Sequence, residues 1–178
     1  RRQRQMCIRD SLDNDHSGTS TASHGTAVSG IALARHNNGS TVGVAPESTY
    51  VPHHLVNGGA MPDDGYYNYT DVVNNSWGYD GTSGVFQNRT PLFLERWQTA
   101  TENSIQVVAA GNDRRPDFWG NRGWDNSNNN GWHGRENIVV GATMRNGEVE
   151  QYSTPGASLF VSAPVNGSNF RFDSARNG

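Results

Sequence analysis

The alternation of short apolar segments with helix-like segments constrains the fold of this chain more than any other feature. The segment Ile105–Ala110 is mainly apolar and is bounded by turn residues, which is typical of a strand buried on both faces. Further strands are predicted near Thr49–Val56, Asp71–Asn74, Ile138–Ala142 and Leu159–Ala163. Strands that alternate with helices predict an α/β domain whose central sheet is mainly parallel, with helices on both faces.

Two helices are predicted between these strands. The first, His24–His36, has apolar residues at helical spacing, Ser23 as its N-cap and Asn37-Asn38-Gly39 as its stop signal. The second begins at Thr90-Pro91, because Thr is a good N-cap and Pro is favoured at the first helical position. Its predicted apolar face consists of Phe93, Leu94, Trp97 and Ala100.

The composition excludes several classes of protein. With 33% hydrophobic residues and 21 Gly, the chain is typical of a loop-rich globular domain and not of a disordered or fibrous one. Its formal net charge is −3, and the part of the chain after residue 10 has no basic patch that would favour a nucleic-acid partner. Since no apolar run approaches membrane-spanning length, no membrane partner is predicted.

The first ten residues resemble a translated DNA adapter. Residues 1–10 can be read codon by codon as the adapter and transposon end used in tagmentation sequencing libraries. The alternative is a basic N-terminal arm. On the first interpretation residues 1–10 are an artefact that packs against nothing, and the domain comprises residues 11–178. Cys7, the only cysteine, would then be absent from the domain, so cysteine usage indicates nothing about redox compartment.

Three segments carry the candidate chemistry. They are His24–Gly30, Asn74–Gly78 and Val107–Asn112, and each falls at a helix start or at the carboxyl end of a strand, where a parallel sheet presents ligands. Taken singly, each has an ordinary structural interpretation: a helix-start histidine, a turn with a buried indole, and a turn asparagine. Their order along one chain is what distinguishes them.

Together, these segments resemble the subtilisin-like serine peptidases, or subtilases (peptidase S8), and within them the kexin or proprotein-convertase branch. His24-Gly25-Thr26 resembles the histidine motif, Asn75–Gly78 the substrate-binding strand, and Ala109–Asn112 the oxyanion motif. The segment Tyr152–Pro164 resembles the strand that leads toward the serine. The resemblance covers residues 12–170 and implies a subtilisin-like fold, truncated at both ends.

The resemblance implies a role for each motif. His24 would be the general base, and the Asn112 side chain would stabilise the oxyanion. The backbone of Ser76-Trp77-Gly78 would pair with the substrate, and Ala110 and Gly111 would wall the primary specificity pocket. The implied function is hydrolysis of peptide or protein substrates by a Ser-His-Asp triad in a secreted or exported enzyme.

Spacing supports the resemblance and also indicates what is missing. His24 and Asn112 are separated by close to the roughly 90 residues found in subtilisin. The triad aspartate is expected roughly 32 residues before the histidine and the serine roughly 157 after it, and both positions fall outside the chain. Asp13 and Asp15 match the polar loop ahead of the histidine and are not taken as substitutes. The chain alone is therefore predicted to be inactive.

Two other functions are alternatives to a peptidase. A subtilase-like domain without activity could serve as a binding or scaffold module, and a replaced serine in the complete protein would favour it. A metal-dependent hydrolase would need clustered ligands, and the pair His53-His54 lies on a predicted strand without Cys or acidic residues at ligand spacing.

Specificity and calcium binding are only partly indicated. The kexin-like branch selects basic residues through carboxylates, and Asp80 and Asp125 occupy plausible matching places. Asn130 stands where the family pattern has a further pocket aspartate, and Thr154 stands where a glutamate would serve a calcium site. The segment 37–41 resembles a calcium loop of subtilisins. No cofactor is required for the chemistry. The sequence does not decide whether a structural calcium ion binds.

Overall fold

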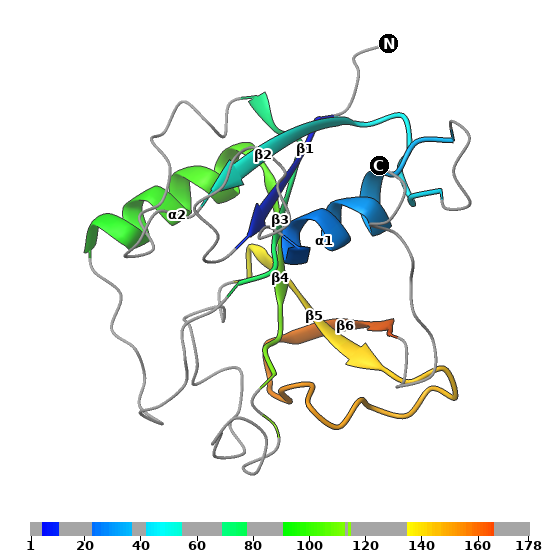
Figure 1. Cartoon of the computed structure of the whole chain (residues 1–178). Helices are drawn as coiled ribbons and strands as arrows, with labels where there is room; N and C mark the ends of the chain where they lie inside the picture. The colour runs from blue at the N-terminus through cyan, green and yellow to red at the C-terminus, as the bar shows by residue number, and fades with distance from the viewer. Residues whose placement is uncertain are drawn as a thin grey trace.

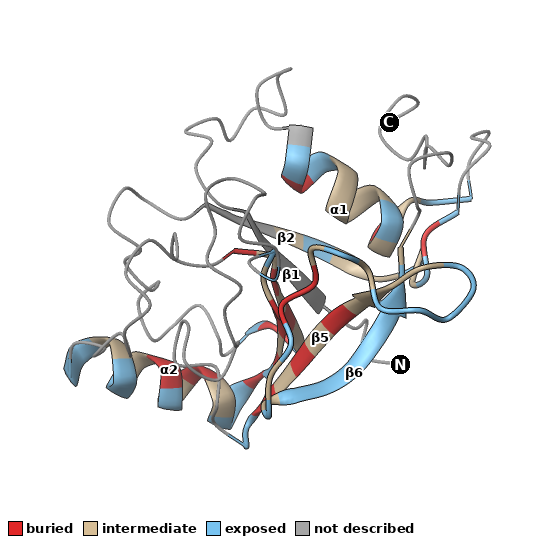
Figure 2. Ribbon diagram, turned by 90° about the horizontal axis from the view of Figure 1, so that it is seen from below, coloured by how far each residue is buried: buried red, intermediate tan, exposed pale blue. Residues whose placement is uncertain are grey.

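The chain forms one parallel sheet with a helix on each face (Figures 1 and 2). The computed structural model describes residues 5–10, 23–36, 42–54, 69–77, 91–112, 114 and 135–165, and it leaves the side chains of residues 5–10, 23 and 52–54 undescribed. The six strands have the order β2-β1-β3-β4-β5-β6. Their bounds, with those of the helices, are β1 Gln5–Asp10, α1 Ser23–Leu33, β2 Thr49–His54, β3 Val72–Asn75, α2 Pro91–Asn103, β4 Ile105–Ala109, β5 Asn137–Thr143 and β6 Leu159–Pro164.

The predicted fold class is thereby confirmed, since all five strand pairings in this sheet are parallel. Figure 2 shows the sheet between α1 and α2. A parallel sheet buries its strands by placing crossover helices on its faces, and each strand–helix–strand unit then brings the carboxyl ends of its strands to one edge.

The prediction that residues 1–10 pack against nothing is wrong. Gln5–Asp10 forms β1, which pairs with β2 on one side and with β3 on the other. Without β1, the facing edges of β2 and β3 would lose their ladder hydrogen bonds, and unpaired backbone groups inside a sheet are costly. The resemblance of residues 1–10 to a translated adapter concerns their origin and stays a prediction.

Helix α1 ends earlier than predicted, at Leu33. The backbone N–H groups of Val44 and Ala45 donate to the carbonyls of Ile31 and Ala32, which are among the last of the helix. This cap requires Gly43, because a Cβ there would come within 2.5 Å of the backbone nitrogen of Leu33. The returning segment therefore ends the helix, and it satisfies carbonyls that a helix terminus leaves without partners.

Helix α2 begins at Pro91, as predicted from the Thr-Pro signal. Trp97 and Ala100 are buried and Phe93 is partly buried against them, with its ring stacked 5.9 Å from that of Trp97. Leu94 was predicted on the same face but is 55% exposed. Helical geometry explains this exposure, because Leu94 lies too far around the helix from Trp97 and Ala100 to reach the sheet.

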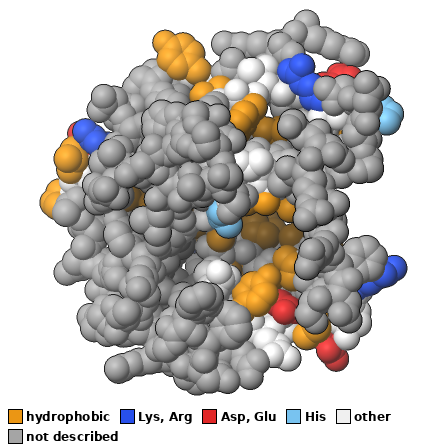
Figure 3. All heavy atoms as spheres, in the orientation of Figure 1, with side chains coloured by type: hydrophobic (Ala, Val, Ile, Leu, Met, Phe, Trp, Pro, Cys, Tyr) orange, Lys and Arg blue, Asp and Glu red, His pale blue; other side chains and the backbone are white. Residues whose placement is uncertain are grey.

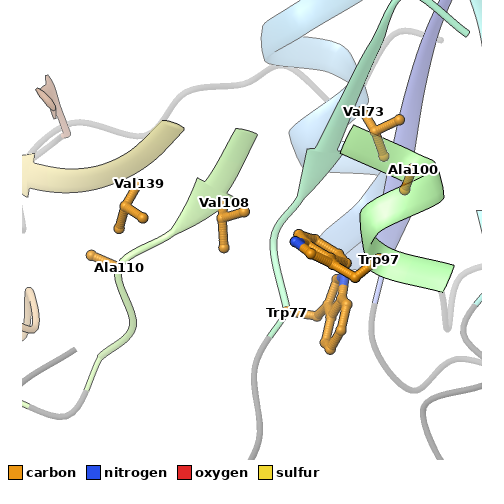
Figure 4. Packing of buried hydrophobic residues seen from close by; sticks show 7 residues of the cluster. All are labelled: Val73, Trp77, Trp97, Ala100, Val108, Ala110 and Val139. Carbon is orange, nitrogen blue, oxygen red and sulfur yellow. The ribbon is translucent and has the colours of Figure 1, made fainter. Parts of the chain in front are cut away.

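Strand β4 is buried on one face, not on both as predicted. Gln106 and Val108 are buried against α2, whereas Ile105 and Ala109 are exposed. Figure 4 shows Val108 within the main apolar cluster, whose members are Val73, Trp77, Trp97, Ala100, Val108, Ala110 and Val139. Alternation along each strand thus assigns one face of the sheet to the core and leaves the other face more open.

Candidate active site

A cavity of about 250 Å³ lies at the carboxyl ends of β3, β4 and β5. Asn74, Val107 and Ala109, which line it, belong to the more open face of the sheet, and Val108 and Ala110 of the core cluster also contribute to the lining. Figure 3 shows hydrophobic side chains at the bottom of a hollow in the surface. The lining residues are Asn74, Ser76, Val107, Val108, Ala109, Ala110, Gly111, Asn112, Val140, Gly141, Ala142, Tyr152, Ser153, Ala163 and Val165.

The end of β4 is held in a defined path that places Asn112 at the cavity. The Ala110 N–H donates to the carbonyl of Val140 at 2.9 Å, which continues the ladder one residue beyond the strand. Gly111 has a φ of 105°, in the left-handed region that favours glycine. Its carbonyl accepts from the Thr154 N–H at 3.1 Å. The chain bends at Gly111, and the exposed Asn112 follows directly.

The end of β3 supplies the second wall. Asn74 Nδ2 donates to Ser76 Oγ at 2.7 Å, and both residues line the cavity. Trp77 is 7% exposed, belongs to the core cluster and is not among the residues that line the cavity, so its indole lies behind this wall. The peptide bond between Ser76 and Trp77 therefore links a residue that lines the cavity, Ser76, to a residue of the core cluster, Trp77.

A third wall comes from β5 and the segment after it. Ser153 Oγ accepts from the Ala142 N–H at 2.9 Å, which ties that segment to the strand. At Gly141 a Cβ would meet Leu159 Cδ1 at 2.9 Å and Ser162 Oγ at 3.0 Å, so a larger residue there would displace side chains of β6. Burial raises the pKa of Tyr152, and the neighbouring charge of Glu150 adds a smaller increase.

Sequence reasoning did not assign this third wall to the site. Gly141, Ala142, Tyr152 and Ser153 all line the cavity, but none was a predicted site residue. The sequence offered one indication of this wall: Gly141 and Ala142 lie near the end of a predicted strand that could be the neighbour of β4 in a parallel sheet. Using it required knowing that β5 is the direct neighbour of β4, which the pairing of Val108 with Val139 establishes.

The structure brings some predicted site residues together and leaves others apart. Ser76, Ala110, Gly111 and Asn112 line one cavity. His24 is exposed in the first turn of α1 and is not among the residues that line it. Gly78, Asp80 and Asn130 lie outside the described residues, as do Asp125, Asp13, Asp15 and the segment 37–41. The roles of all these residues stay predictions.

The family comparison decides the relationship that the motifs suggested. The family model described as Peptidase_S8, the subtilase family, matches residues 1–174. The chain belongs to the subtilase family. Among the curated proteins compared, none matches its sequence.

Solved structures agree with this subtilase assignment at the level of the fold. A serine protease of Aeromonas sobria, in complex with its chaperone, matches with a TM-score of 0.66 at 22% identity, over 92% of this chain and 36% of that one. The subtilisin-like protease Apa1 of Pseudoalteromonas sp. AS-11 gives 0.64 at 22% identity, over 90% and 41%. A protease of Pseudoalteromonas arctica gives 0.62 at 26% identity, over 85% and 46%. The chain thus spans less than half of each of these proteins.

Two observations on the described residues bear on metal binding by this subtilase. There, no group of three or more His, Cys, Asp and Glu side chains could hold a metal ion. Thr154, which stands in place of a calcium-binding glutamate, is 1% exposed and provides a hydroxyl where a carboxylate would be needed. In the same part of the chain, no helix has the length and apolar character needed to cross a bilayer.

Proposed function

We propose that this chain is part of a serine endopeptidase in which Asn112 and Ser76 contribute to the substrate cleft. The observation that carries the proposal is that these two residues line one cavity although they come from separate motifs. Parallel strands present ligands at their carboxyl ends, so the cavity lies where an active site is expected in this type of sheet. The subtilase membership supplies the reaction class.

Each group has a defined role in this reaction. His24 takes the proton of a serine nucleophile and later gives it to the leaving amine. The Asn112 amide donates a hydrogen bond to the oxyanion of the tetrahedral intermediate. Substrate backbone pairs with the chain at Ser76-Trp77-Gly78 as an added strand. The exposure of Asn112 beside the cavity supports the second role.

The nucleophilic serine and the triad aspartate do not occur at the family spacing within the 178 residues, so we propose that a longer chain supplies them. We also propose export, following the family resemblance. Asp10 gives this proposal a sharp test, because it is the last residue of β1 and reaches the same sheet edge as the end of β3. If the aspartate lies elsewhere, Asp10→Asn should leave the activity of the longer chain unchanged.

We propose a kexin-like preference for Arg or Lys before the scissile bond, relaxed enough to accept uncharged residues. Asp80 would meet the basic side chain, whereas Asn130 keeps a hydrogen-bond acceptor but lacks the charge of the family aspartate. A buried cation with too few partners is costly, which weakens the discrimination.

The direct experiment compares hydrolysis of fluorogenic peptides by the 178-residue chain and by a longer chain that adds the missing triad members. The longer chain should cleave them and the shorter chain should not. Matched peptides with Arg, Leu or Phe before the scissile bond then test specificity, and Asn130→Asp should sharpen the preference for Arg. Much faster cleavage of Leu and Phe peptides, unaffected by Asn130→Asp, would reject the kexin-like pocket.

A binding domain without activity is the second candidate function. It is favoured by the position of His24, which is not among the residues that line the cavity. It predicts that a longer chain binds peptides without cleaving them, so the same experiment separates the two functions.

A further inference from the structure

We infer that Gln106 and Asn75 are positioning residues that hold the end of β3 in the geometry needed for peptide binding. The inference rests on the proposed function, since that function assigns peptide pairing to Ser76 and Trp77. It concerns two side chains on the opposite face of the sheet from the cavity. Both are 0% exposed, so neither can touch a substrate itself.

A chain of hydrogen bonds connects helix α2 to the indole of Trp77. Gln106 Nε2 donates to the carbonyl of Ala100 at 3.2 Å and to that of Ser104 at 3.4 Å. Gln106 Oε1 accepts from Asn75 Nδ2 at 3.1 Å. Asn75 Oδ1 in turn accepts from Trp77 Nε1 at 3.1 Å. The chain therefore crosses from α2 through β4 to the end of β3.

The direction of this hydrogen-bond chain is fixed at both ends. The backbone carbonyls near the end of α2 can only accept, so the NH₂ group of Gln106 must face them and its oxygen must face Asn75. The indole N–H of Trp77 can only donate, so the oxygen of Asn75 must face it. Rotating either amide would set donor against donor or acceptor against acceptor. The two amides thus have one satisfied arrangement.

This arrangement reaches the cavity through the backbone of β3. Along the strand, Asn74 and Ser76 line the cavity, whereas Asn75 and Trp77 are buried on the α2 side. Fixing the side chains of Asn75 and Trp77 therefore restrains the intervening peptide units, including that of Ser76. A peptide that adds a strand here depends on the direction of those backbone groups.

The core contains a matched tryptophan whose indole N–H donates to a residue of a different strand, β5. Trp97 is 5% exposed, and its Nε1 donates to Asn137 Oδ1 at 3.1 Å. The bond has the same chemistry and length as that of Trp77, and both indoles belong to one cluster (Figure 4). Trp97, however, is on α2 and is not followed by cavity residues. Substitutions at Trp97 therefore serve as a control: they disturb the core without disturbing the end of β3.

The first measurement follows the indole protons of the 178-residue chain by NMR with ¹⁵N-labelled tryptophan. Gln106→Met removes the amide while keeping a side chain of similar length. The indole proton of Trp77 should exchange about three- to tenfold faster with solvent, the factor expected for weakening one ordinary hydrogen bond. The indole proton of Trp97 is the internal control and should keep its rate. An equal increase at both would indicate general destabilisation and overturn the inference.

The second measurement uses the longer, active peptidase and peptide substrates that span several residues before the scissile bond. Gln106→Met should raise KM about three- to tenfold and change kcat by less than about twofold, because the lost restraint affects peptide pairing and not the chemical step. Trp77→Phe, which removes the indole N–H together with part of the ring system, should act in the same direction. Trp97→Phe should leave KM unchanged.

The two measurements separate failure of this inference from failure of the proposed function. Faster exchange of the Trp77 indole together with an unchanged KM would overturn the positioning role. If the longer chain proves inactive, the dissociation constant for a fluorescein-labelled tetrapeptide ending in Arg replaces KM. An unchanged dissociation constant in Gln106→Met would then equally overturn the positioning role.

Discussion

The two faces of the sheet formed by β3, β4 and β5 differ although the same strands supply both. On the α2 side, Val73, Val108 and Val139 are at most 1% exposed and pack with the helix. On the other side, Ile105 is 54% exposed and the strand ends open into a cavity. Because neighbouring residues of a strand point to opposite faces, a shift of one position decides whether a side chain serves the core or the site.

Substitutions on the two faces of the sheet should therefore have different effects. Changes on the α2 face should lower the free energy of unfolding, whereas changes at the cavity should lower turnover or affinity. Both kinds of effect can be measured in a longer chain that supplies the complete triad.

His24→Ala should abolish nearly all activity and leave the fold intact. Loss of the triad histidine in subtilisin lowers kcat on the order of 10⁶-fold, and we expect a similar loss here. Since His24 is exposed in the first turn of α1, the midpoint of thermal unfolding should change little. Hydrolysis of fluorogenic peptides and a thermal melt measure both quantities. An active His24→Ala enzyme would refute the role assigned to this residue.

Trp97→Ala should have the largest effect on stability. The substitution removes a buried ring and the hydrogen bond to Asn137 Oδ1, and such changes cost about 3–5 kcal/mol. Leu94→Ala on the same helix is the control. Leu94 is 55% exposed, so its loss should change the free energy of unfolding by less than about 0.5 kcal/mol. Urea denaturation measures both variants, and similar costs would contradict the burial of this helix face.

Asn112→Ala should lower kcat about 10²- to 10³-fold and change KM little, which is the effect of removing the corresponding donor in subtilisin. The reason is that the oxyanion exists only in the transition state, so a donor aimed at it acts on the chemical step. Asn103→Ala is a matched control, because Asn103 is also exposed but lies at the end of α2. If both variants retain full turnover, Asn112 is not the oxyanion donor.

Tyr152 should produce the smallest effect, a pH dependence of stability. Burial, and then the charge of Glu150, raise the pKa of its phenol above the usual 10.0. Below pH 10 the phenol is neutral in both states and the stabilisation is complete. As the pH rises above 10, the unfolded state ionises first, so stability falls until the folded pKa is passed. Urea titrations between pH 8 and 11 should show a steeper loss for the wild type than for Tyr152→Phe.

Glu150→Gln tests which of the two causes contributes more to the raised pKa of Tyr152. Since the carboxylate is the smaller of the two causes, the variant should keep most of the pH dependence. A curve identical to that of Tyr152→Phe would mean that charge, and not burial, dominates the raised pKa.

Much of the fold could be predicted because it depends on local sequence. Pro91 starts α2 as predicted, and β2, β5 and β6 lie within a residue or two of their predicted bounds. The errors arose where distant residues decide the outcome. Helix α1 ends at Leu33 because the segment at Gly43–Ala45 takes its last carbonyls, and no local signal near Leu33 indicates this.

The candidate site shows the same division. The order of the three motifs was sufficient to suggest the family, and the family comparison confirmed it. The motifs could not reveal the wall contributed by Gly141, Ala142 and Ser153, since that wall depends on β5 being the neighbour of β4. Nor could they indicate that His24 would not be among the residues lining the cavity.

The strand–helix alternation, the start of α2 and the family motifs follow from local sequence, because each depends on residues within a few positions of one another. Long-range contacts specify which motifs meet, which face of β4 is buried and where residues 5–10 belong. Sheet register joins segments that are far apart in the chain, as Met6 with Val72 or Asn75 with Val108. Only when those pairings exist do Gln106, Asn75 and Trp77 form one hydrogen-bonded path behind the cavity.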